Sequence, residues 1–448
     1  MVFEVESTIK SILEKHNIRE EARNWDHTGV KLVDGKVILP DTFLKVVNEI
    51  IQENQLLSFY VPEELGGLGF GDSIHGPITE VLAGYDFAME IFILISASVI
   101  ESLLLYHKED YNKVIKEFTE GKRLGYVAFT EPQAGSNLEN IKATSEKVGD
   151  EYVLNGTKIF ITNGGYANTG LFLAQNIVNG KREGTNVFLV DNLDGITTLR
   201  LEEKSGLHVS PTAQLQFENV TVPEEYIISD VGNGYRKVLD RLMGMRVGVS
   251  YQTVAAAKRA FEVSLDYAQN REQFGRQIIE FPEVRRKLKQ MMIQIPRMED
   301  YTYQAAVMLE RYKLGWIPYD AGIHQTPEEE INAANNAPPG LIPVLAHYLA
   351  SCSKLYTSEI VNQFLYDAQQ IFGGMGFIAE TEVNKIARDV RITSIYEGTS
   401  EIHNWVINRA QKQIDSLTDF ERPYRKYQER TIYENILFTR FPDLDKKI

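Results

Sequence analysis

The segment IKATSEKVGDEYVLNGTKIFITNG, residues 141–164, decides how the chain is organised. Gly149-Asp150 and Asn155-Gly156 are strong signals for hairpin turns, and the residues around them are typical of strands. The segment therefore predicts strand, turn, strand, turn, strand. Four further strand-like stretches follow (TGLFLAQNIV, TNVFLVDN, ITTLRLEE and AQLQFENVTV). We expect an antiparallel β domain over residues 126–231.

Helical patterns flank this β segment on both sides. Within residues 1–125, apolar residues recur at i, i+3, i+4 and i+7, with a glycine-rich loop between the predicted helices. Residues 232–414 hold four long helical stretches, which predict a bundle with a long inter-helix loop at about 315–340. Residues 415–448 form a C-terminal extension. The predicted fold class is α+β, and the seams between such domains often hold ligands.

Composition excludes several classes of function. The 448 residues include 62 acidic and 47 basic side chains, a net charge of −15, which argues against a general nucleic-acid or anionic-membrane surface. A single cysteine, Cys352, rules out an intrachain disulfide or a cysteine-based metal site, and we expect it to be a small buried residue of a helix. The eight histidines lack metal-ligand spacing, so we predict no metal.

Two segments of the sequence, an apolar run and the N-terminus, bear on where the protein lies in the cell. The apolar run at 87–106 contains Glu90 and Glu101, so it predicts a buried helix rather than a membrane span. The N-terminus has neither the pattern of a signal peptide nor that of a transit peptide. We therefore expect a cytoplasmic protein.

Two motifs in the β segment offer groups that suit a planar ligand bearing phosphate. In FTEPQAGSN, Gly135 and Ser136 supply backbone N–H groups and a hydroxyl. In KIFITNGG, Phe160 and Thr162 are two residues apart and should face the same side of a strand, where a ring can stack and form a hydrogen bond. Taken singly, these motifs are also compatible with an ordinary turn and an ordinary strand end.

Two further groups of residues belong to the helical C-terminal part. In YEGTS, Glu397 lies beside Gly398, which permits a close backbone approach, and Thr399 or Ser400 can cap the next helix. REQFG and QIFGG each end a long helix, where Arg271 can neutralise a phosphate and the glycines can admit a pyrophosphate. The plainer alternatives are a solvated glutamate, a surface arginine and a helix stop.

Together with PEELGGLGF near the N-terminus, these motifs occur in an order and spacing that resembles the acyl-CoA dehydrogenase family of flavoproteins, over residues 63–414. The resemblance implies an N-terminal all-α domain, a middle antiparallel β-barrel domain and a C-terminal four-helix bundle. It also implies FAD bound between the β domain and the bundle, with a second subunit completing the site.

The resemblance assigns roles to individual positions. The flavin contacts it implies are Val127, Phe129, Thr130, Ser136, Phe160, Ile161 and Thr162. The contacts to the adenine dinucleotide, across a dimer interface, are Arg271, Gln273, Phe274, Gln370, Gly373 and Gly374, and further cofactor contacts are Thr399 and Glu401. The implied substrate contacts are Ser136, Arg246, Gly398 and Arg409.

Glu397 falls where most family members carry the catalytic base. A carboxylate suits this role because the α-hydrogen of a thioester is weakly acidic and desolvation raises the pKa of a glutamate toward neutrality. Some members place the base on the first bundle helix, immediately before the position of Arg246. Here that residue is Met245, which cannot accept a proton. Asp86, near the expected acyl pocket, is more typical of a helix start than of a substrate contact.

The implied activity is that of an FAD-dependent acyl-CoA dehydrogenase in fatty acid β-oxidation. It would form a trans-2-enoyl-CoA, pass electrons to an electron-transferring flavoprotein, and assemble as a homotetramer. The alternatives are an acyl-CoA oxidase-like enzyme that uses oxygen, a non-catalytic relative that binds acyl-CoA or flavin, and a DNA-binding relative, which the acidic balance disfavours. The length and shape of the acyl chain do not follow from the sequence.

Overall fold

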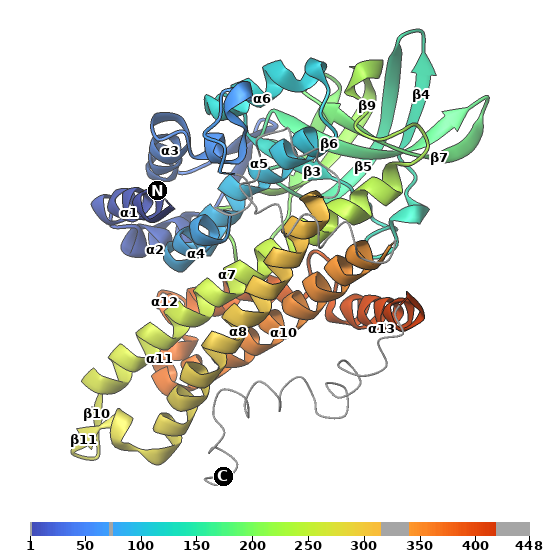
Figure 1. Ribbon diagram of the computed structural model, residues 1–448. Coiled ribbons are helices and arrows are strands. Elements are labelled where there is room, and N and C mark those ends of the chain that lie inside the picture. Colours follow the sequence, from blue (N-terminus) through green and yellow to red (C-terminus); the bar gives the residue numbers. More distant parts are fainter. Residues whose placement is uncertain (1, 71–74, 315–339, 418–448) are drawn as a thin grey trace.

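The computed structural model describes residues 2–70, 75–314 and 340–417, which form a helical part, a curled sheet and a helical bundle in chain order (Figure 1). The predicted loop at 315–340 lies outside these residues except for Gly340, and so does the predicted extension except for residues 415–417. The N-terminal helices are α1 (Val2–Lys15), α2 (Ile18–Thr28), α3 (Asp41–Asn48), α4 (His75–Tyr85), α5 (Phe87–Leu105) and α6 (Asn112–Thr119).

The N-terminal part is helical, as predicted, and it also contains a small hairpin that the prediction did not include. Strands β1 (Lys31–Val33) and β2 (Lys36–Ile38) pair antiparallel around Asp34 and Gly35. Both turn residues have positive φ, 51° and 76°, as a two-residue type I′ hairpin turn requires. The Asp-Gly pair therefore encodes a hairpin that the helical periodicity of the flanking residues obscures.

Helix α5 is the apolar core helix of the N-terminal part. It is the one helix among the described residues that is long and apolar enough to cross a membrane, and 78% of its apolar window is buried inside the protein. Asp86 caps its N-terminus by accepting a 2.7 Å hydrogen bond from the N–H of Met89, and it pairs with Lys385 at 2.5 Å. Asp86 thus occupies a helix start, as its sequence context indicates, and also ties α5 to α12 of the bundle (Glu382–Val390).

The middle part is a seven-stranded sheet in the order β3-β6-β4-β5-β9-β8, with β7 also paired to β6. Its strands are β3 (Gly125–Ala128), β4 (Thr144–Val148), β5 (Glu151–Thr162), β6 (Thr169–Val178), β7 (Lys181–Val190), β8 (Ile196–Leu201) and β9 (Thr212–Pro223). Most pairings are antiparallel, but β6 lies parallel to both β3 and β4. The sheet is therefore mixed rather than purely antiparallel, because strand β5 serves as the crossover that returns the chain in the same direction.

The two turn signals of the β segment have different outcomes. Val148 pairs with Glu151, so Gly149-Asp150 forms the predicted two-residue hairpin turn. The prediction of a turn at Asn155-Gly156 is wrong, because both residues lie inside the twelve-residue strand β5, at a bulge in its pairing with β9. Gly156 has φ 151°, and a Cβ there would lie 2.5 Å from the Cβ of Ala143. The glycine is needed for a close approach of two strands, not for a reversal of the chain.

The C-terminal part is built around long helices, as predicted. They are α7 (Gly234–Asn270), α8 (Pro282–Leu314), α10 (Leu341–Phe372) and α13 (Ser400–Leu417), with the short α11 (Gly374–Phe377) and α12 between the last two. Helix α7 begins beside the sheet and runs to the far tip of the molecule, where β10 (Glu272–Gln273) and β11 (Arg276–Gln277) form a small hairpin (Figure 1). At 37 residues it is about 55 Å long.

Candidate active site

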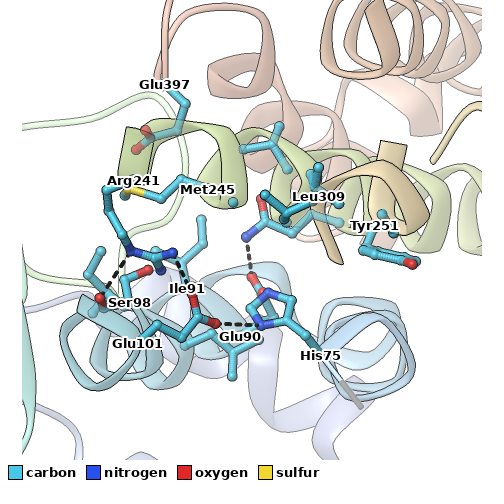
Figure 2. Close-up of a pocket in the computed structure, with 18 of the residues that line it drawn as sticks. His75, Glu90, Ile91, Ser98, Glu101, Arg241, Met245, Tyr251, Leu309 and Glu397 are labelled. Atoms are coloured by element: carbon cyan, nitrogen blue, oxygen red, sulfur yellow. Dashed lines mark hydrogen bonds and ion pairs between the residues drawn. The ribbon is translucent and has the colours of Figure 1, made fainter. Parts of the chain in front are cut away.

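A cavity of about 270 Å³ lies where all three parts of the chain meet. Its walls come from α5, α7 and α8, and Thr162 at the end of β5 and Glu397 in the loop before α13 also line it. Figure 2 shows Glu397 on one side of α7, close to Met245, with the side chains of α5 across the cavity. The structure therefore brings the predicted base and one predicted flavin contact into a single cavity, although they are far apart in the sequence.

The loop that carries Glu397 is held in an unusual conformation. Glu397 has φ 54°, in the left-handed region that non-glycine residues seldom adopt. The carbonyl of Glu397 accepts a hydrogen bond from Arg246 Nε at 3.3 Å, and the carbonyl of Gly398 accepts one from Lys354 Nζ at 2.6 Å. Two buried cations thus anchor the loop through its backbone. Backbone strain of this kind is a feature of functional sites.

The prediction that Arg246 contacts the substrate concerns a side chain that already bonds to the protein. Arg246 is 5% exposed and lies behind Glu397, with Nη1 directed at Ser351 Oγ at 3.4 Å. It places a cation near the predicted base and donates to the backbone of Glu397 and to the side chain of Ser351. Met245, on the adjoining position of α7, does line the cavity.

Burial raises the pKa of Glu397 above its ordinary value, and the cations Arg246, Lys354 and Arg241 offset only part of that effect. A base must be ionised to accept a proton. We therefore expect the rate of substrate dehydrogenation to rise with pH through the raised pKa of Glu397 and then to level off. Stopped-flow measurement of flavin reduction across a pH series would show this profile. A rate already at its maximum well below the ordinary glutamate pKa would contradict the assignment.

A buried ion pair fixes the predicted flavin edge of the sheet. Lys158 Nζ lies 2.8 Å from Glu131 Oε1 and also donates to the carbonyls of Phe129 and Leu173 at 3.1 and 2.7 Å. The N–H of Ile159 donates to the carbonyl of Thr130 at 3.0 Å. These contacts hold the FTEPQAGSN segment against strand β5. The two predicted flavin motifs are therefore adjacent in space.

Phe160 is presented by a distortion of β5 rather than by a regular strand. It has φ 59°, falls at a register shift between Lys158 and Ile161, and its side chain is 60% exposed. The simple alternation that would place Phe160 and Thr162 on one face is interrupted there. The side chain of Ile161 is buried in the core of the sheet. Only its backbone remains available to a ligand.

The remaining predicted flavin contacts line the same edge. Val127 and Thr130 are half-buried, Phe129 is buried, and Ser136 is exposed just beyond the tight turn in which Glu131 and Ala134 pair. An exposed aromatic ring, a free hydroxyl and open backbone at Gly135 form a surface that fits a planar ring system with polar edges. This edge adjoins the cavity through Thr162.

The predicted adenine-dinucleotide contacts lie elsewhere in the molecule. Arg271, Gln273, Phe274, Gln370, Gly373 and Gly374 are all exposed and gather at the far tip of the bundle. That tip is the whole length of α7 away from the sheet (Figure 1). Phe274, with φ 55°, is 95% exposed. A single chain therefore does not unite the two halves of the predicted cofactor site.

The other predicted contacts lie on the outside of α13. Thr399 Oγ1 accepts a hydrogen bond from the N–H of Ile402 at 3.4 Å, so it caps the helix as predicted. Glu401 is exposed on the first turn, and the exposed Arg409 stacks its guanidinium 5.4 Å from the centre of the Trp405 ring. None of the three lines the cavity.

The described residues hold no group of three or more His, Cys, Asp or Glu side chains placed to bind a metal. Cys352 is half-buried on α10, and burial raises the pKa of its thiol to about 12. A thiol with that pKa is a poor nucleophile at neutral pH. The chemistry of the cavity therefore rests on Glu397 and the groups around it.

Sequence reasoning missed the polar groups that line the cavity beside Glu397, chiefly Glu90, Glu101 and Arg241. In the sequence, the two glutamates indicate only that the apolar segment does not span a membrane. Their spacing of eleven residues, three turns of a helix, was the available signal that they share one face of α5.

Comparison with known proteins identifies the family. Residues 127–220 match the model of the acyl-CoA dehydrogenase middle domain, and residues 232–320 and 332–412 match that of the acyl-CoA dehydrogenase C-terminal domain. The human mitochondrial short-chain specific acyl-CoA dehydrogenase is 30% identical over 355 residues, 79% of each chain. The chain belongs to the acyl-CoA dehydrogenase family. An acyl-CoA dehydrogenase of Bacillus subtilis is 28% identical over 405 residues, 90% of this chain and 98% of the relative.

Solved structures agree with this family assignment. Butyryl-CoA dehydrogenase of Megasphaera elsdenii superposes with a TM-score of 0.72 at 27% identity, covering 91% of this chain and 98% of that one. A chain in the structure of the electron transferring flavoprotein of Acidaminococcus fermentans gives 0.75 at 27% identity, with the same coverage. An acyl-CoA dehydrogenase of Bacillus anthracis complexed with FAD gives 0.79 at 25% identity, covering 96% and 70%. The family resemblance and fold class are confirmed, and with them an FAD-dependent oxidoreductase.

Proposed function

We propose that this acyl-CoA dehydrogenase family member oxidises an acyl-CoA thioester to the trans-2-enoyl-CoA. The observation that carries the proposal is the shared cavity, which is lined by Thr162 and by a half-buried glutamate, Glu397, with a raised pKa. The cavity adjoins the exposed ring of Phe160 at the edge of the sheet. A base and a flavin-binding edge on either side of a short acyl chain are what the removal of two adjacent hydrogens requires.

Proton removal and stabilisation of the thioester oxygen are each assigned to a group of this chain. Glu397 takes the proton from the carbon next to the thioester carbonyl. When bound, FAD supplies the acceptor for the hydride from the neighbouring carbon. The backbone N–H of Glu397 is the donor that we assign to the thioester oxygen, where negative charge develops as the proton leaves. Helices α5, α7 and α8 would enclose the acyl chain, and burial among them raises the pKa of Glu397 above its ordinary value, as suits a general base.

The cofactor site is assigned to two regions. Phe129, Thr130, Ser136, Phe160 and Thr162 would hold the flavin ring, and the exposed residues at the bundle tip would hold the adenine dinucleotide of a second copy of the chain. This division is supported by the separation of the two regions, about 55 Å along α7. The exposed Phe274 fits a surface that another subunit covers. We therefore propose a homo-oligomer, with a homotetramer built from two such dimers. We also propose that the protein is cytoplasmic.

We also propose that an electron-transferring flavoprotein is the electron acceptor, supported by the similarity to a chain in the A. fermentans structure. Purified enzyme should convert its acyl-CoA to a product two hydrogens lighter. Turnover should be much faster with an electron-transferring flavoprotein than with oxygen alone. Mass spectrometry of the thioester and parallel assays with each acceptor would test this. Equal or faster turnover with oxygen alone would contradict the acceptor and favour an oxidase.

A further inference from the structure

The cavity that would receive the acyl chain has ionisable side chains in its wall as well as apolar ones. Its apolar lining includes Ile91, Leu94 and Leu309, but the remaining wall carries several ionisable side chains from α5, α7 and α8. Figure 2 shows the side chains of Arg241, Glu101 and His75 directed toward one another across this wall, opposite Glu397. An acyl pocket for a plain hydrocarbon has no use for such groups, because desolvating them against methylenes is unfavourable.

The first polar cluster surrounds Glu101. Its Oε2 lies 2.5 Å from Arg241 Nη1 and 3.8 Å from Lys313 Nζ, and its Oε1 lies 3.5 Å from His75 Nδ1. Arg241 Nε also donates to the carbonyl of Ser98 at 3.2 Å. Burial opposes the charge on Glu101, but Arg241 and Lys313 outweigh it and hold the pKa of Glu101 well below its usual range. Arg241 and Lys313 thus share the carboxylate of Glu101, and Glu310, one turn before Lys313 on α8, also lines the cavity.

The second polar group is Glu90, which is 1% exposed. Its Oε2 accepts a 2.7 Å hydrogen bond from Gln252 Nε2, and the carbonyl oxygen of the Gln252 side chain accepts a hydrogen bond from the hydroxyl of Tyr396. No salt bridge to Glu90 is present within the described parts of the chain, and burial raises its pKa well above the usual range. Glu90 is therefore a buried carboxyl group of the cavity wall that is hydrogen-bonded to an amide rather than to a cation.

Resting on the proposed function, we infer that the substrate is a short acyl-CoA whose acyl group carries a hydrogen-bond-accepting oxygen, not a plain hydrocarbon chain. The cavity wall offers hydrogen-bond donors from Arg241 and Lys313, beside the carboxyl groups of Glu90, Glu101 and Glu310. The apolar residues between them and Glu397 leave room for a few methylenes. The volume, about 270 Å³, lies just below the roughly 300–1,000 Å³ found for ligand pockets, which favours a short chain.

Anaerobic flavin reduction with matched thioesters tests this inference. The panel is hexanoyl-CoA, its ω-hydroxy analogue and adipoyl-CoA, with the corresponding four-carbon set. We expect an oxygen-bearing member to give a kcat/KM about 100-fold or more above its hydrocarbon counterpart, because a pocket built to hydrogen-bond an oxygen rejects the analogue that lacks it. Preference for the carboxylate would assign the cationic cluster as the recognition site, and preference for the hydroxyl would assign Glu90.

Equal or faster reduction by the hydrocarbon members would overturn the inference and leave the proposed dehydrogenase activity standing. Failure of every thioester to reduce the flavin would overturn both. The two proposals are therefore separable in one experiment.

Two double variants test whether the ionisable side chains of the cavity wall determine which acyl-CoA is preferred. Arg241→Leu with Glu101→Leu removes both members of the 2.5 Å ion pair, whereas Arg241→Leu alone would leave Glu101 without its nearest cation. The double variant should gain activity toward hexanoyl-CoA and lose its preference for the carboxylate of adipoyl-CoA. The control is Arg259→Leu with Glu382→Leu, which removes a 2.6 Å ion pair from α7 outside the cavity. The control should keep the wild-type preference, and an unchanged preference in the first variant would contradict the assignment.

Discussion

Replacing Glu397 by glutamine should lower the rate of flavin reduction by acyl-CoA about 10²–10⁴-fold while FAD stays bound. Glutamine keeps the size of the side chain but cannot accept the α-proton. The loop itself is anchored through backbone carbonyls, to Arg246 and Lys354, and these hydrogen bonds do not depend on the carboxylate. Stopped-flow spectroscopy under anaerobic conditions measures the reduction rate, and the visible spectrum of the resting enzyme measures bound flavin.

The matched control is Glu146→Gln, on the exposed face of β4 and away from the cavity. It should reduce at the wild-type rate. A Glu397→Gln variant that reduces as fast as this control would show that another group removes the proton. Since Met245 occupies the position of the alternative base, such a result would leave no carboxylate assigned to the role.

Replacing Lys158 by methionine should destabilise the protein by about 3–5 kcal/mol, because it leaves the Glu131 carboxylate buried without its partner. Both side chains are almost fully buried, 2.8 Å apart. Burial lowers the pKa of Lys158 to about 8, so it is still charged at neutral pH. Burial also opposes the charge on Glu131, but Lys158 and two backbone N–H donors hold the pKa of Glu131 below its usual value. Urea denaturation monitored by circular dichroism measures the loss of unfolding free energy.

Two comparisons make this prediction specific. Lys147→Met removes an exposed ion pair to Glu224 on the same sheet and should change stability little. Lys158→Met with Glu131→Met removes both charges and should recover much of the lost stability. If the single Lys158 variant were no less stable than the Lys147 variant, the ion pair would not be what fixes the flavin edge.

Local patterns predicted the elements of the fold where the chemistry of a few neighbouring residues decides the outcome. The Gly149-Asp150 turn and the long helices follow from such patterns, as does Asp86 at a helix start. Asn155-Gly156 is a case in which the local pattern predicted the wrong structure. The same dipeptide that favours a turn also suits a bulge. Which of the two forms depends on the close approach of Ala143, the residue immediately before strand β4. Such a contact is tertiary and has no local signature.

In the candidate site, too, some features follow from the local sequence and others depend on packing. The motif around Glu397 marks the base, but the direction of the Arg246 side chain depends on where the loop after α12 passes, and the structure turns it to the backbone of Glu397. The polarity of the acyl pocket was hidden for the same reason. Glu101 and Arg241 are 140 positions apart, and only the packing of α5 against α7 makes them a pair. Residue identity predicts the chemistry of a group, whereas packing decides what it faces.

The most direct test of the proposed function is an anaerobic titration of the purified protein with acyl-CoAs, followed in the visible spectrum. Our account predicts a flavin spectrum that bleaches near stoichiometrically with at least one short thioester, most readily one with an oxygen on its acyl chain. A flavin spectrum that no acyl-CoA bleaches would contradict the proposed reaction while leaving the family and cofactor in place. A protein that takes up no FAD at all would contradict the assigned cofactor site as well.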